Sequence, residues 1–221
     1  MGVTILFAQN NIPQARNYLE GSLKHLTLTF DGNIENADKI DNISSSHLLI
    51  KSQILMNLSH VIMVSISSPN DIDAKETIVD YLNTAVKIKR HIFGANHPST
   101  LAALDTLAQS LTTLKLFADA NSTYKQLLKA QKEFYGQHHI CVATTNGKLA
   151  NLYIHLKDYE SAMKCLMLVR SYQMIQVQYG EKKKQRGDDN DKITQDEKML
   201  KATNAAIEKI QVLCDQNRVW I

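Results

Sequence analysis

A pattern that returns after 42 residues constrains this chain more than any other feature of its sequence. The matching pairs are Gly94 and Gly136, His97 and His139, Leu107 and Leu149, Ala108 and Ala150, Phe117 and Tyr159, and Ala120 and Ala162. A fixed period of this size is typical of helical repeat arrays. Such arrays present extended surfaces to other macromolecules, so the period predicts a binding protein rather than an enzyme.

Helical spacing runs through nearly all of the sequence. Apolar residues recur every three or four positions, and no segment alternates in the manner of a strand between hairpin turns. Gly136 and Gly180 follow two of these segments and are predicted to end them, because glycine tolerates a left-handed helix cap. The ranges predicted to be helical are 13–30, 47–66, 72–93, 98–114, 118–134, 141–156, 159–179 and 193–217.

The predicted fold is therefore all-α, a right-handed superhelix (an α-solenoid) of antiparallel helix pairs. We expect one helical-repeat domain over residues 1–221, in which small residues such as Ala108 and Ala120 let paired helices approach closely. Phe134 and Leu156 are predicted to pack on the apolar faces of their helices. The expected parts are a partial first repeat (1–30), a loop (31–46), a second repeat (47–94), a third repeat (95–136), a fourth repeat (137–180), a charged loop (181–191) and a C-terminal capping helix (192–217).

Composition narrows the function classes. The formal charge of +3 is too small for a nucleic-acid footprint, which makes nucleic acid an unlikely partner. The most apolar stretch, residues 48–66, is interrupted by Lys51, Gln53 and His60 among others, so no membrane insertion is expected. The three cysteines are widely spaced, and the start of the chain does not read as a signal peptide. These features predict a cytoplasmic protein.

These residues resemble a known family. The pattern Gly-x-x-His, then Leu-Ala, then an aromatic residue followed by x-x-Ala is similar to tetratricopeptide repeats. The period of 42 residues exceeds the usual period of about 34, and it resembles the repeats of kinesin light chains and of clustered-mitochondria proteins. The resemblance is clear from Ile78 to Gly180, and for the choice of subfamily it is unspecific.

The resemblance implies a site. In tetratricopeptide proteins the first helix of each pair lines a concave groove that takes a peptide. The corresponding positions here are Gln53, Met56, His60 and Met63 in one repeat, Asp105, Gln109 and Thr112 in the next, and Gly147, Asn151 and His155 in the last. Kinesin light chains carry an Asn-Asn pair before Leu-Ala, whereas this chain has Asp105-Thr106 and Gly147-Lys148. Cargo of the kinesin type is therefore not implied.

Other residue patterns have simpler readings. His138, His139, Cys141 and Cys165 could suggest a metal site, but His139 shares its repeat position with His97, where a helix cap explains it. Met56 and Met63 could form an adaptable binding surface or fill the core. No nucleophile elbow, phosphate-binding glycine loop or zinc-protease motif occurs in the sequence. We therefore expect no catalytic residues, no cofactor and no metal.

The predicted function is that of an adaptor or scaffold that binds a protein or peptide segment in the groove. One alternative is a structural subunit of a larger complex, motivated by the irregular first repeat and the inserted loops. A second alternative, suggested only by the likeness to clustered-mitochondria proteins, is an RNA-associated repeat domain of a longer protein. A third is the helical appendix of an enzyme.

Overall fold

The computed structural model describes residues 11–29, 45–66, 71–184 and 191–218. These ranges form helices, turns and no strand, which confirms the predicted all-α class. Most of the predicted 31–46 loop and residues 67–70 lie outside them. Within these ranges the helices are α2 (Ile12–Thr29), α3 (Ser45–Ser65), α4 (Ile72–Phe93), α5 (Pro98–Thr113), α6 (Phe117–Tyr135), α7 (Ile140–His155), α8 (Tyr159–Lys184) and α9 (Asp191–Arg218).

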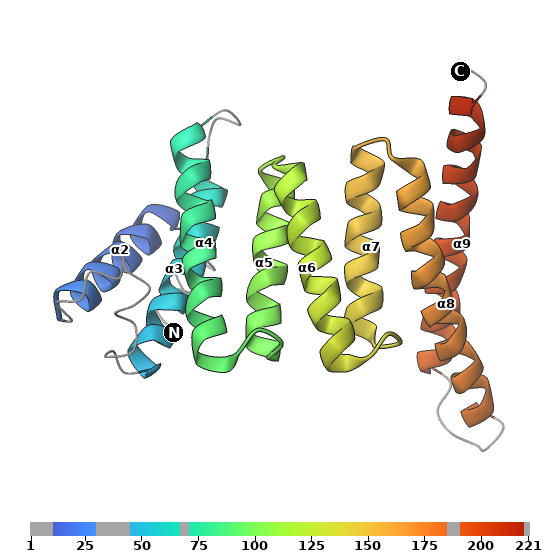
Figure 1. Ribbon diagram of the computed structural model, residues 1–221, viewed down its shortest axis with the longest axis horizontal. Coiled ribbons are helices and arrows are strands. Elements are labelled where there is room, and N and C mark those ends of the chain that lie inside the picture. The colour runs from blue at the N-terminus through green and yellow to red at the C-terminus, as the bar shows by residue number, and fades with distance from the viewer. Residues whose placement is uncertain (1–10, 30–44, 67–70, 185–190, 219–221) are drawn as a thin grey trace. The chain divides into compact units, whose positions relative to one another are not determined.

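The helices belong to two compact units. In the first unit, Met1–Leu116, α2 packs on α3, α3 on α4, and α4 on α5. In the second, Phe117–Ile221, α6 packs on α7, α7 on α8, and α8 on α9. Figure 1 shows that within each unit consecutive helices run in opposite directions. Sequential antiparallel packing is thus confirmed within the units, whereas the single domain and the superhelical hand stay predictions.

Small side chains at repeated positions are fully buried. Ala15, Ala108, Ala120, Ala150 and Ala162 are all fully inaccessible to solvent. A larger side chain at any of these positions would have to displace a neighbouring helix, because protein interiors are packed without spare volume. The repeat spacing therefore places the core correctly.

The first unit is held together by two apolar clusters that share α3. Leu58 and Val61 of α3 pack with Ala15 and Leu19 of α2. Leu48 and Leu55, nearer the start of α3, pack with Ala85 and Ile88 of α4. Both sides of α3 are therefore used in packing.

The packing of α3 against two helices bears on its apolar composition. Of the helices that the structure describes, α3 alone is long and apolar enough to cross a membrane, with a mean hydropathy of 1.4. Its apolar side chains are needed against α2 and α4, and Ser52 and Ser59 are buried beside them with their hydroxyls donating to carbonyls of the same helix. Packing against α2 and α4 therefore uses part of the apolar surface of α3.

Glycines and lysines in the left-handed backbone conformation follow several of the helices. Gly94 (φ 91°) and Gly136 (φ 86°) follow α4 and α6, and the end at Gly136 confirms the prediction. Lys115 (φ 63°) and Lys157 (φ 59°) take the same backbone region after α5 and α7, although they have side chains. Each lysine sits in a Schellman turn, in which the next residue's N–H donates to the carbonyl five residues earlier, for example Leu116 to Leu111 at 2.8 Å.

Several predicted details are wrong. Gly180 does not end a helix, because α8 continues through it to Lys184. The predicted charged loop 181–191 is therefore helical at residues 181–184, and α9 already begins at Asp191. Likewise, Ser45 and Ser46, assigned to the 31–46 loop, begin α3. Phe134 and Leu156 were expected to pack, yet they are 50% and 44% exposed at the ends of α6 and α7.

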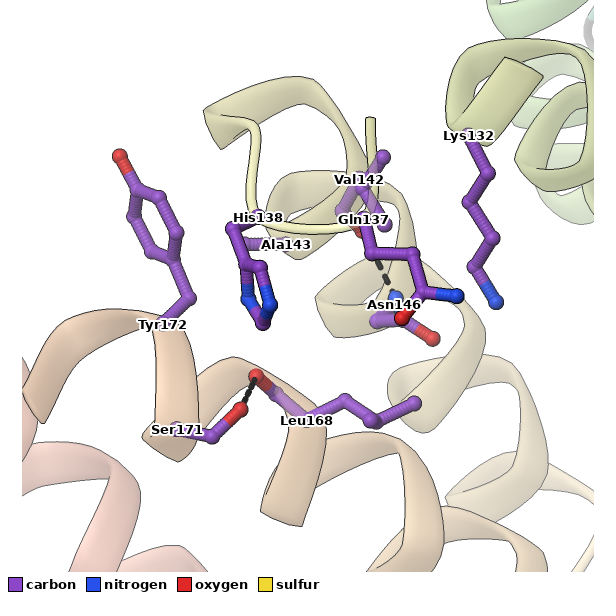
Figure 2. Close-up of a pocket in the computed structure, with 9 residues that line it drawn as sticks. All are labelled: Lys132, Gln137, His138, Val142, Ala143, Asn146, Leu168, Ser171 and Tyr172. Atoms are coloured by element: carbon purple, nitrogen blue, oxygen red, sulfur yellow. Dashed lines mark hydrogen bonds between the residues drawn. The ribbon is translucent and has the colours of Figure 1, made fainter. Parts of the chain in front are cut away.

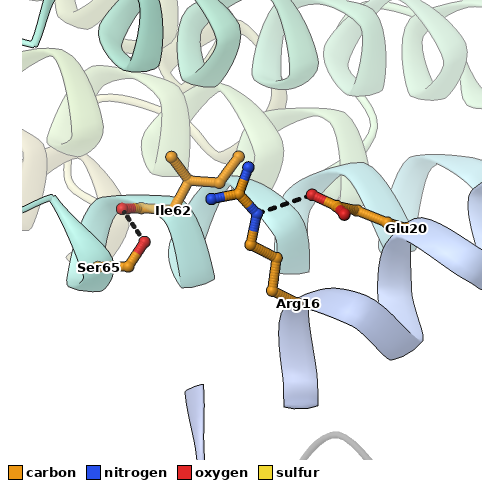
Figure 3. A network of polar contacts seen from close by, with 4 residues as sticks. All are labelled: Arg16, Glu20, Ile62 and Ser65. Atoms are coloured by element: carbon orange, nitrogen blue, oxygen red, sulfur yellow. Dashed lines mark hydrogen bonds and ion pairs between the residues drawn. The ribbon is translucent and has the colours of Figure 1, made fainter. Parts of the chain in front are cut away.

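Polar contacts on the outer surface are mostly local to one helix. On α2, Arg16 Nε lies 2.7 Å from Glu20 Oε1, and both side chains are about half exposed (Figure 3). On α3 the Ser65 hydroxyl donates to the Ile62 carbonyl at 2.9 Å. An exposed pair such as Arg16 and Glu20 contributes only about 0.3–0.5 kcal/mol. Burial of apolar side chains between helices therefore dominates the stability of the fold.

Candidate functional site

The ten predicted groove residues lie on α3, α5 and α7, the first helices of their pairs. Those on α3 and α5 belong to the first unit, and those on α7 belong to the second. None of the ten is fully buried. Gln53, His60, Gln109, Asn151 and His155 are exposed, whereas Met56, Met63, Asp105 and Thr112 are half-buried.

On α3 the four positions divide into two kinds. Gln53 and His60 face solvent, and the Gln53 amide donates to Asn57 Oδ1 at 3.1 Å. Met56 instead packs partly against the α3–α4 cluster that contains Leu55. Thus Met56 contributes to the core at the same time as it borders the surface, and only part of its side chain is available to a ligand.

On α5 the polar side chains are fixed by their own helix. Gln109 Nε2 donates to Asp105 Oδ2 at 2.9 Å, one turn away. The Thr112 hydroxyl donates to the Ala108 carbonyl at 2.9 Å. Because these contacts lie within one helix, Asp105 and Gln109 can present a carboxylate oxygen and an amide in a fixed geometry.

On α7 the exposed predicted residues are Asn151 and His155. His155 stacks on Phe117, the first residue of α6, with the ring centroids 6.3 Å apart and the planes 6° from parallel. Asn151 lies one turn before it and is exposed. Gly147, which the resemblance also placed here, is half-buried, and a Cβ at that position would meet Val169 of α8 only at van der Waals distance. The α7 surface therefore combines an aromatic stack with an amide.

A cavity of about 210 Å³ extends the α3 and α5 surfaces within the first unit. Met63 and Ile66 line it from the end of α3, Leu114 and Lys115 from the end of α5, and Lys75 from the start of α4. The cavity thus has an apolar floor with two lysines beside it. Of the predicted residues it includes only Met63, and it is the place where the structure brings the α3 and α5 ends together.

A second, smaller pocket of about 60 Å³ lies in the second unit (Figure 2). Its lining includes Lys132 of the last turn of α6, His138 of the turn before α7, and Leu168, Ser171 and Tyr172 of α8. Burial and the charge of Asp196 raise the pKa of Tyr172, so its phenol stays protonated and can donate. This pocket is not predictable from the sequence, because its lining residues come from three helices.

The repeated histidines are helix caps. His97 Nδ1 accepts a hydrogen bond from the Ser99 N–H at 3.1 Å, and His139 Nδ1 accepts one from the Cys141 N–H at 3.2 Å. Each ring also stacks on the aromatic residue that precedes the turn, 4.6 Å from Phe93 and 4.3 Å from Tyr135. This stack was missed, although Phe93 and Tyr135 also stand 42 residues apart.

The cap leaves the histidine–cysteine cluster without a metal-site geometry. His139 Nδ1 is already engaged by a backbone N–H, and Cys165 is buried. Burial, reinforced by the carboxylate of Asp158, raises the pKa of the Cys165 thiol and disfavours the thiolate that a metal requires. Within the described ranges no three His, Cys, Asp or Glu side chains are grouped closely enough to hold a metal ion.

Comparison with known proteins identifies the fold. No protein-family model matches the chain, and no curated protein matches it by sequence. A putative kinesin light chain from Podosopora anserina with nearly identical TPR-like repeats superimposes with a TM-score of 0.62 at 16% identity, over 98% of this chain and 90% of that one. BtubC (BKLC) from P. vanneervenii gives 0.58 at 14% identity, over 98% and 75%. The apo form of RapI gives 0.50 at 17% identity, over 99% and 68%.

Proposed function

We propose that this chain, whose fold is that of the TPR-like helical repeat proteins, is an adaptor that binds a peptide segment of another protein along α3 and α5, the first-of-pair helices of its first unit. The fold supports a role in protein interaction, because arrays of this kind present extended surfaces and carry little chemistry. The three free cysteines support a reducing location, and we propose the cytoplasm.

The observation that carries the proposal is the arrangement on α5. Asp105 and Gln109 are locked together at 2.9 Å and remain accessible beside Thr112. A peptide in extended conformation offers backbone N–H and C=O groups, which a carboxylate and an amide can bind as acceptor and donor. Because the side chains are already ordered by their own helix, binding costs less conformational entropy than on a mobile surface.

The cavity at the end of α3 and α5 supports an apolar anchor for the same peptide. Met63, Ile66 and Leu114 form a floor that can receive an aliphatic side chain, and methionine adapts readily to different shapes. Lys75 and Lys115 stand at the same cavity. The proposed ligand is therefore a segment with an aliphatic residue near an acidic one.

The test uses peptides selected against the whole chain from a random display library. Their affinities are then measured by fluorescence anisotropy for the wild type and for the double variant Asp105→Ala, Gln109→Ala. Loss of two hydrogen-bonding side chains should weaken binding about 10-fold or more. Helicity and stability should change little, because both side chains lie on the surface.

A matched control exists on α9, where Gln211 donates to Asp215 at 3.1 Å with the same spacing and chemistry. The double variant Gln211→Ala, Asp215→Ala should bind the selected peptides as tightly as the wild type. If the α5 variant binds as well as the α9 variant, or if both lose affinity equally, the proposed site is wrong.

A further inference from the structure

A polar side chain occupies a core position of α7. Asn146 stands 42 residues after Leu104, so the two residues hold the same place in successive repeats. Both are buried, with 3% and 4% of their surfaces exposed. The repeat architecture therefore accepts an aliphatic side chain at this position, and a polar one needs a separate explanation.

The fold uses only one end of the Asn146 amide. Its Nδ2 atom donates to the Val142 carbonyl at 2.8 Å, which identifies the other end as the oxygen. No described residue of the chain donates a hydrogen bond to this oxygen. Thr100, a buried residue of α5, differs in this respect, because its hydroxyl donates to the Gly94 carbonyl at 2.9 Å. A buried acceptor lowers stability unless a donor reaches it, so the Asn146 oxygen needs a donor from outside the chain.

The Asn146 side chain lines the smaller pocket of the second unit (Figure 2). Asn146, Val142 and Ala143 are buried members of this lining, whereas Lys132 and Gln137 are exposed at its rim. In Figure 2 the Lys132 ammonium and the Gln137 amide lie on the same side of the pocket as the Asn146 oxygen. The pocket thus combines a buried acceptor with a positive charge that is accessible from solvent.

The size of the pocket limits what can enter it. A cavity of about 60 Å³ has room for about four to six atoms, since one water-sized atom needs about 10–15 Å³. A whole amino acid or a nucleotide is too large, whereas the last atoms of one side chain fit. Val142, Ala143 and Leu168 offer apolar contacts to the methylene groups of such a side chain.

The polar groups of the pocket select the chemistry of the ligand. A carboxylate has acceptors only and leaves the Asn146 oxygen without a donor, and an ammonium group is repelled by Lys132. A carboxamide carries a donor and an acceptor at the same end of a side chain. We propose that this pocket binds the side-chain carboxamide of a glutamine or asparagine in a partner protein. Its N–H donates to Asn146 Oδ1, and its oxygen accepts from Lys132 Nζ.

A protein is the expected source of the carboxamide. The pocket is too small for a free amino acid, and its rim is exposed at Gln137 and His138, so the main chain of a partner can remain outside. This site goes beyond the proposed peptide binding and does not depend on it, because α5 belongs to the first unit. The double variant Asp105→Ala, Gln109→Ala should therefore leave the pocket unaffected, and the two proposals can fail separately.

The first test uses the full chain labelled with nitrogen-15 and follows its amide resonances by NMR. The probes are N-acetyl-glutamine N-methylamide and the corresponding glutamate compound at pH 7. The glutamine probe should shift the resonances of residues 142–146 and 168–172, with a Kd on the order of 1 mM because few atoms make contact. The glutamate probe should bind at least about 10-fold more weakly, because it leaves the Asn146 oxygen unpaired. Equal or tighter binding of the glutamate probe, or no saturable shift in these residues, overturns the proposal.

The second test removes the proposed acceptor. Asn146→Leu should fold, because Leu104 fills the equivalent position, and it should lose binding of the glutamine probe. Its urea midpoint should not fall below that of the wild type, since an unpaired polar group is replaced by an apolar one. Unchanged binding would show that Asn146 does not contact the ligand, and a lower midpoint would assign the amide to the fold; either result overturns the proposal.

The third test removes the positive charge. Lys132→Met should weaken binding of the glutamine probe about 10-fold, because a charge-assisted hydrogen bond is lost. Lys129→Met is the matched control, since Lys129 is an exposed lysine one turn earlier on α6 and does not line the pocket. Equal effects of the two substitutions would contradict the proposed contact.

Free L-glutamine tests the source of the ligand. Its side chain is that of the capped probe, but its main chain carries two charges. The capped probe should bind at least as tightly as the free amino acid, because only the side chain enters the pocket. Free L-glutamine that binds 10-fold more tightly would overturn a protein as the source.

Discussion

The strongest quantitative prediction concerns His139, because its two contacts can be removed separately. His139 caps α7 through Nδ1 and stacks on Tyr135 with the ring centroids 4.3 Å apart. Loss of a helix cap costs about 1 kcal/mol, and loss of an aromatic pair costs about 0.5–1.5 kcal/mol. His139→Ala should therefore lower the free energy of unfolding by about 2 kcal/mol.

Two further variants separate the contribution of the helix cap from that of the aromatic stack. His139→Asn keeps a side-chain acceptor for the first turn of α7 and loses the stack, so about half of the loss should return. His139→Phe keeps a ring against Tyr135 but cannot accept a hydrogen bond, so it too should show about half of the loss. The measurement is urea unfolding followed by circular dichroism at the helical signal, with free energies obtained by linear extrapolation.

His138→Ala provides the control, because His138 is exposed and does not cap α7. It should stay within about 0.5 kcal/mol of the wild type. If His139→Ala is equally harmless, or if His139→Asn is as damaging as His139→Ala, the capping argument is refuted. Zinc should leave the wild-type unfolding curve unchanged, whereas a metal site that involved His139 would raise stability with zinc concentration.

Three other predictions address the helix ends, the helix contacts and a buried charge. Lys157→Gly should raise the free energy of unfolding by about 0.5–1 kcal/mol in urea unfolding, because glycine takes the left-handed backbone (φ 59°) without the Cβ penalty; an unchanged or lower value would contradict this. Ala150→Leu should lower stability by about 1–3 kcal/mol in the same assay, because Ala150 is fully inaccessible and a larger side chain must displace its surroundings; a neutral result would mean that the site has free volume. Burial lowers the pKa of Lys51, because the folded state is destabilised when this side chain is charged. Below the folded pKa this loss of stability is complete, and it disappears as the pH rises toward 10.5. Lys51→Met should therefore be more stable than wild type at pH 7, by less than about 1 kcal/mol because Lys51 is only half-buried. The difference should shrink as the pH approaches 10.5, and a difference that does not change with pH would contradict this prediction.

The sequence determined the helical architecture and much of the core. Its 42-residue offset located Ala108, Ala120, Ala150 and Ala162, which are fully inaccessible in the structure. This succeeds because repeats conserve the points where helices touch, and only small side chains fit there. The same spacing identified His97 and the other repeat histidine as caps.

Helix ends were predicted less well, because different residues can end a helix. Gly94 and Gly136 end helices, but Gly180 lies inside α8. Whether a glycine becomes a cap depends on whether the following residues can pack as helix against a neighbour. After Gly180, α8 continues as helix to Lys184. A local pattern does not contain this information.

The candidate binding surfaces, too, could be predicted only in part from the sequence. Periodicity placed Gln53, Asp105 and Asn151 on accessible sides of their helices, because side-chain direction follows from helix geometry alone. Only the tertiary structure decided that Met56 packs partly into the core and that Met63 borders a cavity with Lys115. Cavities arise where the ends of several helices fail to fill space together, and this depends on distances between segments far apart in the chain.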